Sequence, residues 1–189
     1  MLMVEVTYLP LTLWVPNITD EQFQEFCEQY ENYQLEYTAD GELLIMPPTD
    51  PETGIQESII TAQLVNWAMA ARKGAVTSPS AGFVLPSGAR LSPDAAWMTF
   101  DRVRQRPTCP QFVIELVSPW DRSRTTRAKM REWISNGAEL AWMIDPRTQT
   151  VTIYRPGQEP EVRTGINQIA GEGPVEGFIL DLEKVWRPL

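Results

Sequence analysis

Two acidic residues of this sequence stand beside runs of apolar residues. Glu115 interrupts the apolar segment 112–117, and Asp94 follows Pro93 at the start of the apolar segment 95–98. An unpaired anion inside a strand buried on both faces costs several kcal/mol. Glu115 is therefore paired, protonated or metal-bound, or it faces water on an edge strand. Asp94 is either a ligand or an ordinary turn residue at the start of a strand.

At the heads of neighbouring strands, these two carboxylates would form a hard-oxygen site of the kind that Mg²⁺ or Mn²⁺ prefers. A third candidate, Lys129, lies on the helix expected after the Glu115 strand. It shares one helix face with Thr125 and Trp133, at the border of the apolar stripe. Its ammonium would either extend to solvent or reach over the end of the sheet. In the second case it could position and activate an attacking water and steady a phosphate oxygen.

The composition excludes several other kinds of chemistry. The 189 residues include no histidine, so neither a Ser-His-Asp triad nor a histidine zinc site can form. Cys27 and Cys109 lie far apart and form no CxxC pair, which fits a reduced cytoplasm. No apolar stretch is long enough to cross a membrane, and residues 1–16 lack the basic start of a signal peptide. We therefore expect a cytoplasmic protein.

Charge is distributed unevenly along the chain. Sixteen Lys and Arg against 25 Asp and Glu give a net charge of −9, which argues against general electrostatic binding to DNA. Segment 121–132 is an exception, because five cations against two acids give it a local charge of +3. Its candidate DNA contacts are Arg122, Arg124 and Arg127. A second cluster is formed by Arg102, Arg104 and Arg106. The alternative is that both clusters are simply solvated faces.

The elements that would position these side chains follow from hydrophobic periodicity and turn residues. An N-terminal arm and helix are expected over 1–32, since Thr19 and Gln22 have the spacing of a capping box. Asp40-Gly41 predicts a hairpin between strands 34–38 and 43–46. The elements expected after it are a helix over 52–72 ended by Gly74, short strands within 75–100, a strand over 111–118, a helix over 123–136, and strands over 140–144 and 151–154. Residues 156–189 would form a C-terminal extension with apolar runs at 166–170 and 178–182. This order predicts a single α/β domain over 1–189, with a mixed central sheet flanked by helices.

Several motifs together carry a family resemblance. They are Ser92-Pro93-Asp94, Phe112-Val113-Ile114-Glu115-Leu116-Val117-Ser118-Pro119-x-Asp121, Lys129-x-x-x-Trp133-x-x-x-Gly137, Trp142-Met143-Ile144-Asp145-Pro146 and Val151-x-Ile153-Tyr154-Arg155. In order and spacing they resemble the Uma-type restriction endonuclease family of the PD-(D/E)XK superfamily. The resemblance runs from about Pro47 to Arg155. It implies a restriction-endonuclease-like core over 47–155 and a metal-dependent nuclease acting on DNA.

Carried over to this sequence, the resemblance implies that Asp94 and Glu115 bind Mg²⁺ (or Mn²⁺) and that Lys129 is the catalytic lysine. Three departures accompany it. The superfamily's usual lysine position in the strand is Val117 here, and the aromatic residue four positions after the lysine is Trp133 instead of Tyr. For the acidic residue that the family often has on the early helix, Glu57 is the nearest candidate. Gln63 is a further possible polar contact in the site. A homodimer is expected by analogy, because cutting both strands of a duplex needs two sites.

A function of a different class stays open. The same fold could serve as a binding or oligomerisation module without catalysis, as the net charge of −9 and the missing strand lysine suggest. The leucine-rich arm would then pack on a second subunit, because it carries more apolar surface than a free tail should expose.

Overall fold

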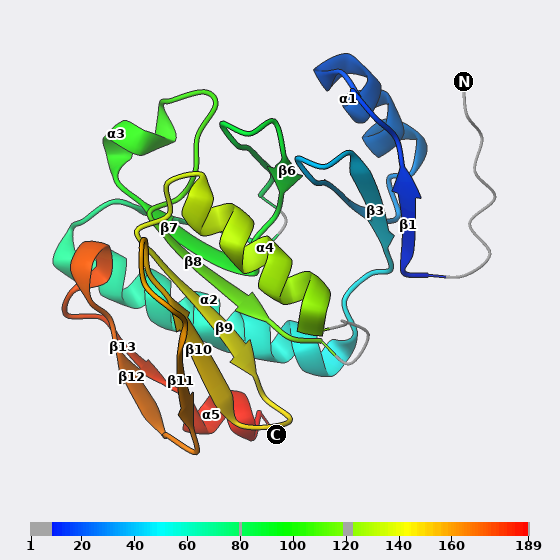
Figure 1. Ribbon diagram of the computed structural model, residues 1–189. Helices are drawn as coiled ribbons and strands as arrows, with labels where there is room; N and C mark the ends of the chain where they lie inside the picture. The colour runs from blue at the N-terminus through cyan, green and yellow to red at the C-terminus, as the bar shows by residue number, and fades with distance from the viewer. Residues whose placement is uncertain (1–8, 80, 119–122, 189) are drawn as a thin grey trace.

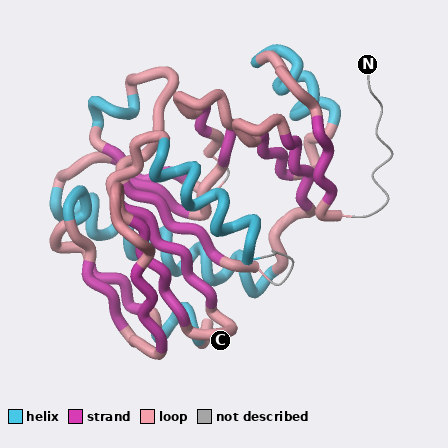
Figure 2. Tube along the Cα trace, in the orientation of Figure 1, coloured by secondary structure: helices cyan, strands magenta, loops and turns pink. Residues whose placement is uncertain are grey.

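The structure is a computed structural model that describes residues 9–79, 81–118 and 123–188. Two sheets organise the chain, with a short C-terminal hairpin beside them (Figures 1 and 2). The N-terminal sheet has the order β1 (Leu11–Trp14), β3 (Glu42–Met46), β2 (Gln34–Tyr37), β6 (Arg90–Leu91) and β5 (Phe83–Val84). The central sheet has the order β11 (Glu161–Thr164), β10 (Thr150–Tyr154), β9 (Leu140–Asp145), β8 (Phe112–Leu116), β7 (Ala95–Met98) and β4 (Ala75–Thr77).

The central sheet is mixed and is covered by a helix on each face. Strands β8 and β9 are parallel, and its other neighbouring strands are antiparallel. A parallel pair needs a crossover connection, which α4 (Ser123–Ser135) supplies. In Figure 1, α4 lies in front of this sheet and α2 (Pro51–Ala71) lies behind it. The fold class expected from the sequence is therefore confirmed.

Strand β8 is buried on both faces because each face meets one of these helices. Phe112, Ile114 and Leu116 join the hydrophobic core on the α2 side. Val113 and Val117 join the core on the α4 side. Since side chains alternate along a strand, Glu115 belongs to the α4 face. A carboxylate is thereby placed inside the protein, where it needs partners.

The N-terminal sheet has its own core, covered by α1 (Asp20–Gln29). The capping box of Thr19 and Gln22 is present as predicted. Buried side chains of β2 and β3 pack against aromatic residues of α1. The described part of the arm forms β1, pairs with β3 and packs Leu11 and Leu13 into this core. The packing of the arm on a second subunit, proposed for a binding module, stays a prediction.

The C-terminal segment packs on α2. Its two apolar runs pair as an antiparallel hairpin of β12 (Gln168–Ala170) and β13 (Ile179–Asp181). A single 3-10 turn (Gly173–Val175) lies between them, and α5 (Glu183–Trp186) follows. Phe178 and Val185 are buried in the same core as the α2 face of the central sheet.

Single residues set the ends of two elements. Helix α2 ends within one residue of the expected position, and its C-cap Arg72 is in the left-handed conformation at φ 53°, two residues before Gly74. The apolar segment 95–98 forms β7, which stops at Met98 because Thr99 caps the short helix α3 (Phe100–Val103) with its side chain. In the described part of the chain, no helix has both the length and the apolar character needed to cross a bilayer.

Candidate active site

Asp94 and Glu115 lie next to each other at one end of the central sheet. Strands β7 and β8 are antiparallel, with Ala95 opposite Ile114. Continued by one residue, this register brings Asp94 opposite Glu115. The backbone N–H of Leu116 donates to Asp94 Oδ2 at 2.5 Å, which fixes that carboxylate against the end of β8.

Lys129 reaches the same place from α4. Its Nζ lies 2.9 Å from Glu115 Oε2 and donates to the backbone oxygen of Ser92 at 2.8 Å. It also forms an ion pair of 2.8 Å with Glu36 Oε1. An ammonium has three N–H donors, and these three oxygens equal them in number. In this arrangement the cation is fully engaged by the protein.

Trp133 holds the other oxygen of Glu115. It lies one helical turn after Lys129, is fully buried, and donates from Nε1 to Glu115 Oε1 at 2.7 Å. The sequence placed Trp133 on the helix face of Lys129, as a Trp in place of the family's Tyr. In the structure its indole nitrogen is what distinguishes it from a simple core residue.

Glu36 is the site residue that the sequence analysis missed. It lies in β2 of the N-terminal sheet and is only 2% exposed. Its Oε1 accepts from the backbone N–H of Ser92 at 2.8 Å, in addition to pairing with Lys129. Between Leu35 and Tyr37, which face α1, an alternating pattern predicts a solvent-facing residue. That second face of β2 meets the central part of the molecule instead, and no signal in the sequence indicates this.

Of the two additional candidates, Glu57 belongs to the cluster and Gln63 does not. Burial raises the pKa of Glu57 to about 7, with Asp94 adding to the shift and Lys129 opposing it. Gln63 instead pairs with the backbone of Asp181, accepting at 2.8 Å and donating at 3.1 Å. It joins α2 to β13, away from the carboxylates.

The electrostatics of the cluster are those of a site with excess negative charge. Burial raises the pKa of Glu115 well above its usual value, and Asp94 and Glu36 raise it further while Lys129 lowers it. Burial by itself would lower the pKa of Lys129, but Glu115 and Glu36 outweigh it and the pKa rises. Lys129 thus pairs with two carboxylates, Glu36 and Glu115, while Asp94 also raises its pKa and Lys129 lowers that of Glu57.

This donor set fits a divalent metal ion that keeps part of its water shell. Mg²⁺ is usually held by one or two carboxylates and several waters, and the neighbouring Asp94 and Glu115 supply such a pair. Within the described ranges, no three acidic or cysteine side chains form a ready-made cage for a cation. A metal bound here would therefore rely on water or on a substrate oxygen for its remaining ligands.

The predicted DNA contacts are only partly within the described structure. Arg122 and the side chain of Arg124 lie outside it. Arg127 is exposed, and it lies two residues before Lys129, which is about 200° around the helix. Its charge acts on Tyr154: burial raises the pKa of that tyrosine, and Arg127 offsets part of the rise. Arg127 is therefore on the β10 flank of α4, not beside the carboxylates.

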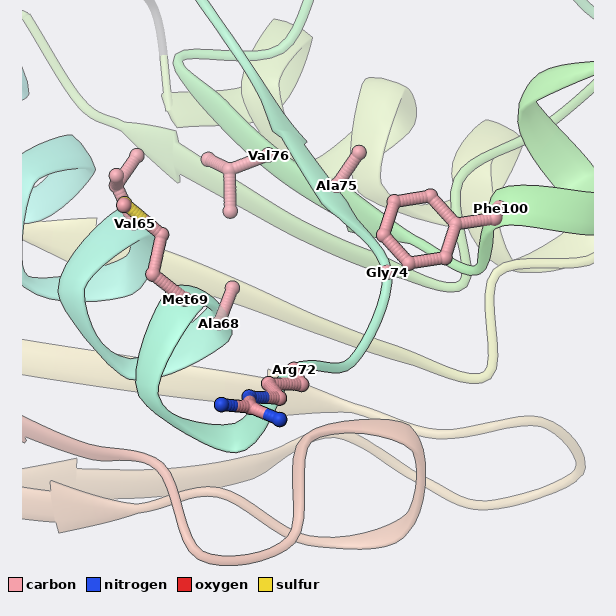
Figure 3. A pocket seen from close by; sticks show the side chains of 8 residues that line it. All are labelled: Val65, Ala68, Met69, Arg72, Gly74, Ala75, Val76 and Phe100. Carbon is pink, nitrogen blue, oxygen red and sulfur yellow. The ribbon is translucent and has the colours of Figure 1, made fainter.

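An apolar hollow elsewhere on the molecule is separate from this cluster. Figure 3 shows its lining, which includes Val65 and Met69 of α2, Val76 of β4 and the ring of Phe100. Met69 lies twelve residues after Glu57 on the same helix, which is about 18 Å along the axis. The described residues that line the hollow include no acidic side chain.

Comparisons with known proteins give the family and the fold of the chain. The model of the Uma2 family, described as "Putative restriction endonuclease", matches residues 20–183. A similar solved structure is the crystal structure of a "putative nuclease belonging to DUF820" from Anabaena variabilis. It has a TM-score of 0.71 and 19% sequence identity, over 80% of this chain and 89% of that one. None of the curated proteins matches this sequence. The fold is thus restriction-endonuclease-like, and the chain belongs to the Uma2 family.

Proposed function

We propose that this protein is a nuclease that hydrolyses DNA phosphodiester bonds with Mg²⁺ or Mn²⁺. The observation that carries the proposal is the meeting of Asp94, Glu115 and Lys129 at one end of the sheet, in a cluster with more anions than cations. Membership of a family described as restriction endonucleases supports a nuclease function with DNA as the substrate.

In this proposal Asp94 and Glu115 are the protein ligands of the metal. A bound divalent cation lowers the pKa of its water and neutralises charge on a phosphoryl oxygen. The remaining roles belong to the chain. Leu116 N–H and Trp133 Nε1 orient the two carboxylates through the hydrogen bonds described above. Glu57, with a pKa of about 7 raised by burial and by the charge of Asp94, could hold or release a proton near neutral pH.

Lys129 is proposed to orient the attacking water and a phosphate oxygen. Because its three N–H groups face three protein oxygens, it can do so only after releasing one of them. The Glu115 contact is the one that would be given up, since Glu115 is also the proposed metal ligand. The raised pKa of Lys129 keeps it cationic, so it would act as a positive donor and not as a base.

The test is nicking of supercoiled plasmid and cleavage of single-stranded DNA, with Mg²⁺ or Mn²⁺, by the wild-type protein, Asp94→Ala and Lys129→Ala. Asp101→Ala is the control, because Asp101 is an exposed acid on α3. We expect metal-dependent cleavage by the wild type and the control, and none by the two site variants. Cleavage that persists in Asp94→Ala would refute the assigned site.

We further propose a homodimer, since a duplex presents two strands to be cut. Light scattering on the purified protein should give twice the chain mass of 21.5 kDa. A single-chain mass at the concentrations at which the protein cuts both strands would refute this part of the proposal.

A second candidate function is a binding or oligomerisation module of the same fold. The full engagement of Lys129 and the net charge of −9 favour it. Metal binding separates the two candidates. A nuclease should show a thermal shift with Mn²⁺ that Asp94→Ala abolishes, whereas a module without catalysis should show none.

A further inference from the structure

We propose that Glu36 is a positioning residue, which keeps the Lys129 ammonium in the site when Glu115 turns to the metal. The inference rests on the proposed function. Its starting point is that Lys129 bonds to two carboxylates that come from different sheets, Glu36 at 2.8 Å and Glu115 at 2.9 Å.

The two carboxylates are not equivalent in their surroundings. Glu115 lies beside Asp94, so a cation held by this pair would compete with Lys129 for Glu115. Glu36 is tied by the backbone N–H of Ser92, at 2.8 Å on the same oxygen that pairs with Lys129. Ser92 also accepts from Lys129 through its carbonyl, at 2.8 Å. Glu36 and Ser92 thus form a clamp that retains the ammonium by two of its three N–H groups.

The third N–H of Lys129, now directed at Glu115, is the one that becomes available for a substrate oxygen. Without the charge of Glu36, Lys129 would keep only Glu115 of the two carboxylates with which it pairs. Lys129 would then compete more strongly with a metal for Glu115. Once the metal held Glu115, the ammonium would leave its position next to Ser92. Glu36 should therefore favour metal binding indirectly, by making Lys129 less dependent on Glu115.

The experiment is a calorimetric titration with MnCl₂ of the wild type, Glu36→Gln, Lys129→Met and the double variant. Glu36→Gln keeps the size of the side chain and an oxygen for Ser92, so the fold should be retained, and a thermal melt checks this. Glu42→Gln is the matched control, as Glu42 is an exposed glutamate of the adjoining strand β3. Plasmid cleavage is measured on the same samples.

We expect Glu36→Gln to weaken Mn²⁺ binding about tenfold, in the range of coupling within one charged network. In the Lys129→Met background the same change should alter the dissociation constant less than about threefold, because Glu36 acts through the lysine. Cleavage should be lost in Glu36→Gln even at saturating Mn²⁺, and Glu42→Gln should behave as the wild type.

Equal weakening in both backgrounds would overturn the proposal, since Glu36 would then act on the metal directly. A Glu36→Gln protein that binds Mn²⁺ and cuts like the wild type would also overturn it, while leaving the nuclease function intact. A wild-type protein that binds no Mn²⁺ would refute the proposed function and this inference together.

Discussion

Removing the ammonium of Lys129 should destabilise the protein in a strongly pH-dependent way. Lys129→Met keeps a chain of similar length but leaves Glu36 and Glu115, which are 2% and 3% exposed, without their cation. Breaking a buried ion pair by removing one partner costs about 3–5 kcal/mol. That cost has an upper limit, because an orphaned carboxylate can take up a proton instead of remaining charged.

The limit can be worked out from the ordinary carboxyl pKa of 4.5. Protonating each orphaned group costs about 1.4 kcal/mol per pH unit above that value, hence about 5 kcal/mol per group at pH 8 and about 0.7 kcal/mol per group at pH 5. The loss of stability should therefore be about 3–5 kcal/mol at pH 8 and about 1 kcal/mol at pH 5. For a chain of this size these values correspond to about 10 °C and about 3 °C in Tm.

The assay is thermal unfolding at pH 5 and pH 8, with Arg131→Met as the matched control. Arg131 is an exposed cation on the same helix, so its loss should change stability by less than about 0.5 kcal/mol at either pH. Mn²⁺ should restore part of the lost Tm of Lys129→Met at pH 8. If Lys129→Met loses the same stability at both pH values, the buried-charge reasoning is wrong and the effect is one of packing.

Three further predictions follow from individual contacts. Trp133→Phe removes the donor to the buried Glu115 and should lower the free energy of unfolding in urea by about 2–4 kcal/mol, whereas an unchanged value would mean that the indole N–H contributes nothing. The pKa of Glu57 is about 7 in the folded protein, against an ordinary value of 4.5. Between these two values the folded protein keeps a proton that the unfolded chain has lost. The stability present below pH 4.5 is therefore lost as the pH rises through 7. Glu57→Gln should therefore raise stability at pH 8 by about 1–2 kcal/mol, after allowance for solvent screening, and should have little effect at pH 4; a gain of equal size at both would contradict the assignment. Gly74→Ala should destabilise by at least about 2 kcal/mol more than Gly88→Ala in the same thermal melt. Both glycines have positive φ, but a Cβ at Gly74 would clash with the backbone oxygen of Met98 while Gly88 faces open space. Equal losses would show that only the backbone angle matters.

The sequence was sufficient for most of the fold because local signals and burial agree there. The capping box at Thr19 and the hairpin turn at Asp40-Gly41 are set by neighbours a few residues away, and both elements form where expected. The apolar run around Glu115 predicted a central strand, and β8 is buried throughout. The end of α2 falls within one residue of the expected position, although Arg72 and not a glycine adopts the left-handed conformation at its C-cap.

For the candidate site, the sequence could identify residues that are out of place in their own segment, but not those whose surroundings come from elsewhere. Glu115 was recognisable because a carboxylate interrupts an apolar run. Glu36 was not, because a charged residue in an alternating strand is ordinary, and only the packing of one sheet against another buries it. Gln63 illustrates the reverse error, since its partner is a backbone more than a hundred residues later in the chain.

The pairing of Glu36 with Lys129 also makes the site depend on how the molecule unfolds. Within the N-terminal sheet, β2 is joined to β6 by one residue pair only, Tyr37 with Arg90. In the central sheet, β8 and β9 are paired over five residues. Local opening of β1, β2 and β3 would therefore require less free energy than global unfolding. Such an opening would remove Glu36 from Lys129 while leaving the central sheet intact. Hydrogen exchange should then find that the amides of β2 exchange sooner than those of β8. A chain opened in this way would keep the core of the central sheet but would lack the Glu36 carboxylate at Lys129.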